Sequence, residues 1–134
     1  MRALPMATIL VIDDDASMRR TLVRILGPEH NVIEAQDGSV GLALFATHAP
    51  ELVITDIVMP KKEGIETILE LRRRAPGLRI IAISGGGEIR NADYLDMAEK
   101  LGADAAMPKP LRVADLRETV NRLLSVPGLS SCTF

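Results

Sequence analysis

The strongest constraint on the fold is a repeated alternation of short apolar segments with longer segments of helical periodicity. Each short segment is an almost unbroken run of β-branched and aliphatic residues, which is typical of a strand buried on both faces. Five strands are predicted in this way: Thr8–Ile12, Asn31–Ala35, Leu52–Asp56, Leu78–Ser84 and Ala105–Met107. Each is followed by residues with the spacing of an amphipathic helix.

The predicted helices take their ends from glycine and proline. The first carries Met18, Leu22, Ile25 and Leu26 and stops at Gly27-Pro28. The others are Gly38 to about Thr47, Glu63 to Arg74, about Asn91 to Leu101, and about Val113 to Leu124. Five strands that alternate with helices specify a parallel sheet covered on both faces, and right-handed crossovers make it doubly wound. Five units are too few to close a barrel.

Several side chains have an expected environment. In the third predicted helix, Leu69 is expected to face inward with the other apolar residues, namely Ile65, Ile68 and Leu71. The run Arg72 to Arg74 is expected to be solvated, because positive charge suits the C-terminal end of a helix. His30 and His48 are expected in solvent as well, and Asp15 is expected to cap the first helix.

Charged and polar residues stand where the predicted strands end. Asp13, Asp14 and Asp15 follow the first strand, Asp56 ends the third, Ser84 ends the fourth, and Lys109 follows the fifth. In a doubly wound fold, ligands bind outside the carboxyl ends of the strands, so these side chains are expected on one rim.

Such a rim favours a hard cation and phosphoryl chemistry. Two carboxylates about 4 Å apart repel by about 4 kcal/mol at an effective dielectric near 20, so the acidic cluster needs a cation. The predicted ligands are oxygens, with no His or Cys nearby, which indicates Mg²⁺. Lys109 and the Ser84 hydroxyl can hold phosphoryl oxygens, and Asp56 is placed as a carboxylate nucleophile.

At these residues the chain resembles a response-regulator receiver domain of two-component signalling, of the stand-alone, chemotaxis-regulator-like type. The resemblance covers roughly residues 7 to 125. It rests on the pair Asp13-Asp14, on Asp56 with Met59-Pro60 three residues later, on Ser84, and on Lys109-Pro110. It implies a flavodoxin-like strand order 2-1-3-4-5, with a receiver domain at 1–125 and a tail at 126–134 that is no output domain.

The resemblance also implies roles for these residues. Asp56 would take a phosphoryl group from a histidine kinase or a histidine phosphotransfer protein. Asp14, Asp56 and the backbone carbonyl of Val58 would bind Mg²⁺ directly, and Asp13 would act largely through water. The Lys109–Pro110 peptide bond would be cis. Such a domain is no enzyme in the ordinary sense, because it promotes only its own phosphorylation and dephosphorylation, and it switches conformation to control a protein target that the sequence does not name.

One position departs from the family pattern. Receivers commonly carry Tyr or Phe three residues before the lysine, where this chain has Ala106. Alanine has no rotamer to switch, so we expect a rearrangement near Ser84 to replace the usual aromatic relay. The following Gly85-Gly86-Gly87 lacks the lysine-serine signature of a nucleotide loop and is predicted to be a hinge.

Three alternatives stay open at this point. A degenerate receiver could bind proteins without phosphorylation; the intact acidic residues and Lys109 argue against it, but Ala106 keeps it open. A haloacid-dehalogenase-type phosphohydrolase would use Asp13, Asp15 and Lys109, but it leaves Asp56 and Met59-Pro60 unexplained. A flavodoxin-like flavin or nucleotide module is disfavoured because aromatic residues make up only 2% of the chain.

Charge and composition limit the partners and the compartment. The net charge of -2 argues against a nucleic-acid binder. No apolar run approaches the roughly 20 residues of a membrane span, and the first residues do not form a signal peptide. Cys132 is the single cysteine, which excludes a disulfide framework and fits a reducing cytoplasm. A monomer or a weak dimer is expected.

Overall fold

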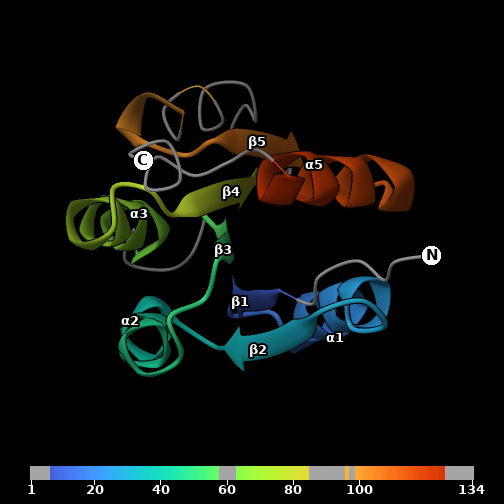
Figure 1. Ribbon diagram of the computed structural model, residues 1–134, viewed down its shortest axis with the longest axis horizontal. Helices are drawn as coiled ribbons and strands as arrows, with labels where there is room; N and C mark the ends of the chain where they lie inside the picture. Colours follow the sequence, from blue (N-terminus) through green and yellow to red (C-terminus); the bar gives the residue numbers. More distant parts are fainter. Residues whose placement is uncertain (1–6, 58–62, 85–95, 97–98, 126–134) are drawn as a thin grey trace.

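The computed structural model describes residues 7–57, 63–84, 96 and 99–125, and it has the predicted doubly wound architecture (Figure 1). Its elements, in chain order, are β1 (Thr8–Ile12), α1 (Ala16–Leu26), β2 (Asn31–Ala35), α2 (Gly38–His48), β3 (Leu52–Asp56), α3 (Glu63–Arg74), β4 (Arg79–Ser84), β5 (Ala105–Pro108) and α5 (Val113–Ser125). Asp96 and residues 99–101 are helical, and the remainder of the helix expected near Asn91 to Leu101 lies outside the described residues.

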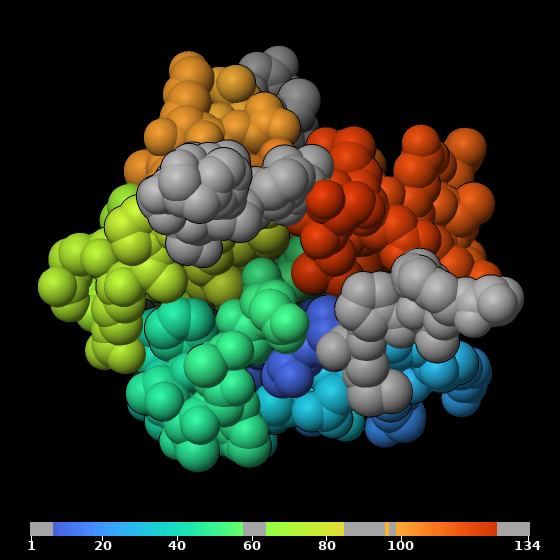
Figure 2. Space-filling model, viewed as in Figure 1, coloured from blue at the N-terminus to red at the C-terminus, as the bar shows by residue number. Residues whose placement is uncertain are grey.

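The five strands form one parallel sheet in the order β2-β1-β3-β4-β5, as predicted. Helices α1 and α5 lie together on one face, while α2 and α3 lie together on the other (Figure 1). Figure 2 shows the α2 and α3 surfaces next to each other on the left and α5 on the right. Within the part of the chain that the structure describes, no helix is long and apolar enough to cross a membrane.

Each face of the sheet has its own apolar core. Strand residues alternate between the two cores: Ile9 and Val11 pack toward α1 and α5, whereas Leu10 and Ile12 pack toward α2 and α3. This alternation follows from the two-residue period of a strand. All four of these side chains are fully buried, which explains why the strands read as continuous apolar runs.

Aspartates cap the two helices that follow the first two strands. The Asp15 carboxylate accepts a hydrogen bond from the Ser17 amide at the start of α1, which confirms its predicted role. Asp37 does the same for the Val40 amide at the start of α2. Both caps satisfy amides that have no partner within the helix.

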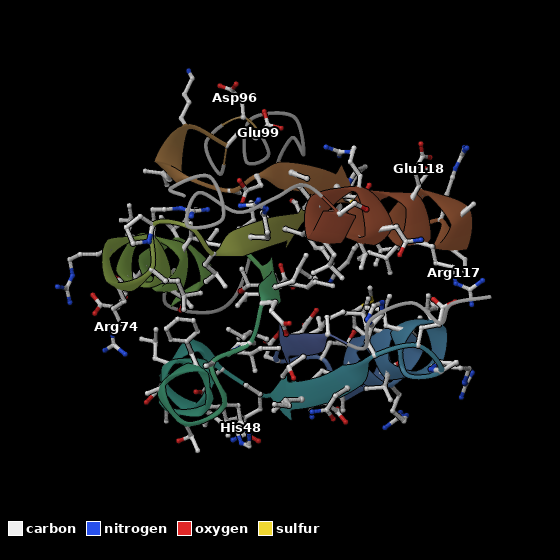
Figure 3. All side chains as sticks on the ribbon, viewed as in Figure 1. His48, Arg74, Asp96, Glu99, Arg117 and Glu118 are labelled. Carbon is white, nitrogen blue, oxygen red and sulfur yellow. The ribbon has the colours of Figure 1, made fainter. Side chains whose placement is uncertain are left out.

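Arg72 corrects the prediction that the arginines ending α3 are solvated. Its guanidinium donates to the carbonyl oxygens of Pro76 and Leu78 at 2.7 Å each, and to that of Gly102 at 2.6 Å. It also pairs with Asp104 at 3.0 Å. Arg72 therefore ties the end of α3 to the segments that lead into β4 and β5. The neighbouring Arg73 and Arg74 follow the prediction and pair with Glu70 on the helix surface; Figure 3 shows Arg74 pointing away from the fold.

Two other expected environments were wrong. His30 is buried rather than solvated, because its Nδ1 accepts a hydrogen bond from the Ala7 amide at 3.3 Å, beneath the start of β1. Leu69 does not face inward: it is 46% exposed on α3, whereas the adjacent Ile68 is fully buried. The expectation for His48 is confirmed, since it is exposed at the end of α2 (Figure 3).

Candidate functional site

The carboxyl ends of four adjacent strands position the candidate residues. Asp13 directly follows β1, Asp56 is the last residue of β3, and Ser84 is the last residue of β4. Lys109 directly follows β5. The strand order reverses direction between β1 and β3, so the site lies at the switch point where doubly wound sheets bind ligands.

The structure brings the three predicted carboxylates together. One oxygen each from Asp13, Asp14 and Asp56 lies within 4.8 Å of the others. Lys109 joins two of them: its Nζ donates to Asp56 at 3.0 Å and to Asp13 at 3.3 Å. Asp13 and Asp56 are buried, with 1% and 4% of their surface exposed, whereas Asp14 faces solvent. The cluster therefore combines two buried carboxylates with a third that is accessible to solvent.

Burial and like charge destabilise the ionised form of Asp13. Desolvation raises the pKa of the Asp13 carboxyl above its ordinary value of 3.8, and the negative charge of Asp56 adds to the rise. A hydrogen bond from the Asp15 amide, at 2.9 Å from Oδ1, and the nearby Lys109 act in the opposite direction without cancelling it. The ionised carboxyl of Asp13 is therefore less stable in this site than in water.

The same carboxylates stabilise the charged form of Lys109. Burial alone would lower the pKa of its ammonium group, but the hydrogen bond and charge of Asp56, together with Asp13, raise the pKa above 10.5. The ammonium group is thus held in its charged form. One such cation faces three carboxylates, so the cluster carries an excess of negative charge.

This donor set fits a hard divalent cation. The cluster offers carboxylate oxygens, which Mg²⁺ prefers, and none of the groups of potential metal ligands among the described residues contains His or Cys. Mg²⁺ holds its ligands at about 2.0–2.1 Å, so opposite ligands lie about 4.2 Å apart. The cluster is only slightly wider, and exposed Asp14 leaves one side open to water or a substrate.

Ser84 reaches the same rim from β4. Its side chain is fully buried, and its carbonyl accepts the Lys109 amide at 2.8 Å, which fixes the start of the segment after β5. Across the strand pair, Ile83 is opposite Asp56 and its carbonyl accepts the Ile57 amide at 2.9 Å. The backbone thus holds Asp56, Ser84 and Lys109 in one register. The Lys109–Pro110 peptide bond is cis, as expected.

Gly64, in the first turn of α3, lies directly against the backbone of the site. A Cβ atom at this position would overlap the carbonyl oxygen of Asp56 and the Cα of Ile57. The helix therefore approaches the end of β3 more closely than any residue with a side chain would allow.

Other predicted residues are either outside the described residues or make different contacts. Val58, Met59, Pro60 and the glycines from 85 to 87 are outside the described residues, so the expected Val58 ligand and the glycine hinge stay predictions. Ala106 is half-buried on β5, opposite Ala82, and packs against the core beneath α2 and α3. Asp15 belongs to the helix cap and is exposed.

Sequence reasoning missed Arg19. This residue of α1 donates from Nη1 to the carbonyl oxygen of Asp13 at 2.7 Å and from Nε to Glu34 on β2 at 3.2 Å. One signal was available: helical side chains lean toward the N-terminus of their helix, and Arg19 lies one turn after the capping Asp15. Its contact with Glu34 depends on how β1 and β2 pair, which the sequence around Arg19 does not contain.

Comparisons with known proteins place the chain in one family. A family model described as "Response regulator receiver domain" matches residues 9–121. The chemotaxis protein CheY of Halobacterium salinarum is 30% identical over 118 residues, which cover 87% of this chain and 96% of that protein. The probable transcriptional regulator ycf27 of Cyanophora paradoxa is 36% identical over 117 residues, which cover 87% of this chain and 47% of that protein. The chain spans about half the length of several such curated relatives, including the response regulator MprA of Mycobacterium, at 50%.

Solved structures agree as well. The receiver domain of NtrX from Brucella abortus superposes with a TM-score of 0.82 at 30% identity, over 89% of this chain and 99% of that one. A response regulator receiver domain protein from Clostridium thermocellum gives a TM-score of 0.82 at 29% identity, over 90% and 95% of the two chains.

Proposed function

This chain belongs to the response regulator receiver family, and on that premise we propose that it is a switch that carries a phosphoryl group on Asp56. The observation that supports this function best is the convergence of Asp13, Asp14 and Asp56 around Lys109 at the carboxyl edge of the sheet. Two buried carboxylates share one ammonium group in this cluster, and a divalent cation held there would neutralise the remaining negative charge.

Asp56 is the proposed phosphoryl acceptor. A carboxylate oxygen of Asp56 attacks the phosphorus atom of a phosphohistidine on a histidine kinase or a histidine phosphotransfer protein. A P–O bond forms and the P–N bond breaks, and its electron pair returns to the imidazole, which takes up a proton. Hydrolysis of the resulting aspartyl phosphate restores the carboxylate and releases phosphate. The domain thus promotes only reactions of its own aspartate.

The surrounding residues have roles that follow from their chemistry. Asp13, Asp14 and Asp56 would hold Mg²⁺, which would neutralise charge on the phosphoryl oxygens. The Val58 carbonyl is the further ligand that the family resemblance implies. Lys109 would leave its carboxylate partners to pair with one phosphoryl oxygen, and the Ser84 hydroxyl would donate to another. The changed contacts of Ser84 and Lys109 would alter the neighbouring surface, which a downstream protein would recognise. That target, the cognate kinase, a cytoplasmic location and a monomeric or weakly dimeric state stay predictions.

Membership of the receiver family argues against the hydrolase and the flavin module. A degenerate receiver that binds partners without phosphorylation is the remaining second candidate, and the observation that favours it is Ala106 at the usual aromatic position. The two candidates differ in a single property, namely whether Asp56 accepts a phosphoryl group.

Intact mass spectrometry after incubation with acetyl phosphate and Mg²⁺ tests the proposal. We expect the parent chain to gain one phosphoryl group that hydroxylamine removes, because an acyl phosphate is sensitive to this nucleophile. Asp56→Asn should gain none, and omission of Mg²⁺ should suppress the gain. Asp96→Asn is a matched control, since Asp96 is exposed and pairs only with Lys100 among the described contacts (Figure 3).

The opposing results are equally clear. A parent chain that binds Mg²⁺ but gains no phosphoryl group would support the degenerate receiver. Labelling that persists in Asp56→Asn would mean that another residue is the acceptor.

A further inference from the structure

Arg19 connects the acidic segment to β2, and none of the roles above includes it. We propose that Arg19, held by Glu34, is a positioning residue that sets the Asp13–Asp14 segment in the geometry that binds a divalent cation. This inference rests on the proposed function, because it concerns the same cation site. Arg19 acts through the backbone of Asp13, and among the described contacts it touches no carboxylate of the site.

Strand β2 holds the Asp13 backbone at two points. The Asp13 amide donates to the carbonyl oxygen of Ala35, the last residue of β2, at 3.1 Å. The Asp13 carbonyl accepts the Nη1 of Arg19 at 2.7 Å, and the same guanidinium pairs with Glu34, the residue before Ala35. One strand therefore fixes the N–H group of Asp13 directly and its C=O group through Arg19.

This arrangement matters because the peptide group that follows Asp13 leads to Asp14. The Asp13 carbonyl belongs to the peptide unit that joins these two residues, so its direction helps to set where the Asp14 backbone begins. Asp14 is exposed and is one of the three carboxylates of the cluster. The Arg19 side chain itself is largely buried, at 17% exposed, which limits its own freedom.

Arginine suits this task for a chemical reason. The guanidinium group is planar and always charged, and its donors point in fixed directions, so it can bind two acceptors at a set angle. A lysine ammonium group lacks this fork. Groups that orient the ligands of a metal without touching it commonly change metal affinity by 10-fold to 100-fold when they are removed.

An effect of the Arg19 charge and an effect of its positioning role would change cation affinity in opposite directions when Arg19 is removed. If Arg19 acted only as a nearby positive charge, its removal would leave the site more negative and would tighten binding of a divalent cation. If Arg19 holds the segment in place, its removal should weaken binding, because the cation must then order the segment itself. Glu34 pairs with the guanidinium and offsets its charge, which leaves position as the larger effect.

Isothermal titration of the full chain with Mg²⁺ separates these possibilities. We expect Arg19→Ala to raise the Kd for Mg²⁺ about 10-fold. Arg19→Lys should fall between the parent and Arg19→Ala, since it keeps the charge but loses the fork. Glu34→Ala should also weaken binding, but it is only a supporting variant, because loss of its negative charge and loss of positioning act in the same direction. The matched control is Arg20→Ala, which removes an exposed arginine next in the chain and should leave the Kd unchanged.

Amide hydrogen exchange gives a second readout that does not depend on bound metal. In metal-free protein, the amides of Asp15 and Ser17 should exchange faster in Arg19→Ala than in the parent or in Arg20→Ala, because these amides bond to the Asp13 and Asp15 carboxylates of the same segment. If Arg19→Ala does not fold, Arg19→Lys carries the same comparison with a smaller change, because it keeps the positive charge and removes only the fork.

The experiments distinguish a failure of the Arg19 positioning role from a failure of the proposed function. Binding in Arg19→Ala as tight as in the parent, or tighter, would overturn the positioning role while leaving the proposed function intact. A parent chain that binds no Mg²⁺ and accepts no phosphoryl group would overturn the proposed function, and the role of Arg19 with it.

Discussion

Strand β5 has a cation at each end, and the two are used differently. Arg72 lies at the amino end, where its donors meet four carbonyl oxygens, those of Ala75, Pro76, Leu78 and Gly102, and the carboxylate of Asp104. Lys109 lies at the carboxyl end, where one ammonium group faces a cluster of three carboxylates. Their side chains are similarly exposed, at 23% and 20%, so burial does not distinguish them.

The balance of partners distinguishes them. At the amino end, one cation meets one carboxylate and a set of neutral carbonyls, and Asp104 also accepts the Ile80 amide at 2.8 Å. That arrangement is electrically balanced and stabilises the fold. The carboxyl end keeps an excess of negative charge, which weakens the fold locally and leaves a place for a cation. The two ends of β5 thus differ in how completely their buried charges are compensated: the balanced amino end stabilises the fold, and the unbalanced carboxyl end can bind a cation.

The largest expected effect is at the amino end. Arg72→Ala removes the donors that join α3 to the segments before β4 and β5, and should lower the free energy of unfolding by about 2 kcal/mol, the usual scale for hydrogen bonds to a charged group. Urea unfolding followed by circular dichroism measures this change. Arg73→Ala is the control: the Arg73 side chain is 72% exposed, so little change is expected. Equal losses in the two variants would contradict a special role for Arg72.

A smaller effect of opposite sign is expected at the carboxyl end. Asp13→Asn keeps an oxygen that accepts the Asp15 amide, and Lys109 keeps Asp56, while a buried negative charge disappears. In the absence of divalent cations, the free energy of unfolding should rise by about 1 kcal/mol, a common gain when a functional residue is replaced. The same urea titration measures it. A loss of stability would mean that the Asp13 charge is already compensated in the resting protein.

The smallest expected effect is the pH dependence of the stability that Asp13→Asn gains. The folded-state pKa of Asp13 lies above 3.8, so between 3.8 and the folded value the native chain keeps a proton that the unfolded chain has lost. The Asp13 contribution to stability therefore falls as the pH rises through this window. The advantage of Asp13→Asn should be small below pH 3.8 and should grow to a plateau above the folded pKa.

Urea unfolding of both proteins at a series of acid and neutral pH values tests this window. An advantage that does not change with pH would exclude the Asp13 charge as its cause. Lys109 adds an alkaline limit: because its folded pKa is raised, its stabilising contribution is complete below 10.5 and is lost as the pH rises through the folded value.

The sequence predicts the sheet and the convergence of the acidic side chains, for a physical reason. Buried parallel strands need continuous apolar runs, and the chain contains five of them, so the carboxyl ends that bear Asp13, Asp56 and Lys109 could be assigned to one edge. The order of the strands in the chain and the geometry of parallel strands are sufficient for this assignment.

Two of the three errors concern side chains whose partners are distant in the chain. Arg72 was expected in solvent, but its partners Gly102 and Asp104 are about thirty residues away, and only the folded arrangement brings them near. His30 was expected in solvent, but it is buried and its Nδ1 accepts a hydrogen bond from the amide of Ala7, a residue 23 positions earlier that directly precedes β1. The helical period allowed Leu69 to face inward, but the sheet covers only part of the surface of α3.

The close approach of Gly64 to Asp56 limits which residues this chain can tolerate. If position 64 is randomised, glycine alone should be recovered among folded variants, since even alanine would overlap the Asp56 carbonyl. Gly77 should accept alanine, because a Cβ atom there meets nothing within 4 Å. The acceptor aspartate thus restricts mutation at a position eight residues further along the chain. An experimental map of tolerated substitutions would locate the edge of the site at Gly64, although Gly64 carries no side chain that could take part in the chemistry.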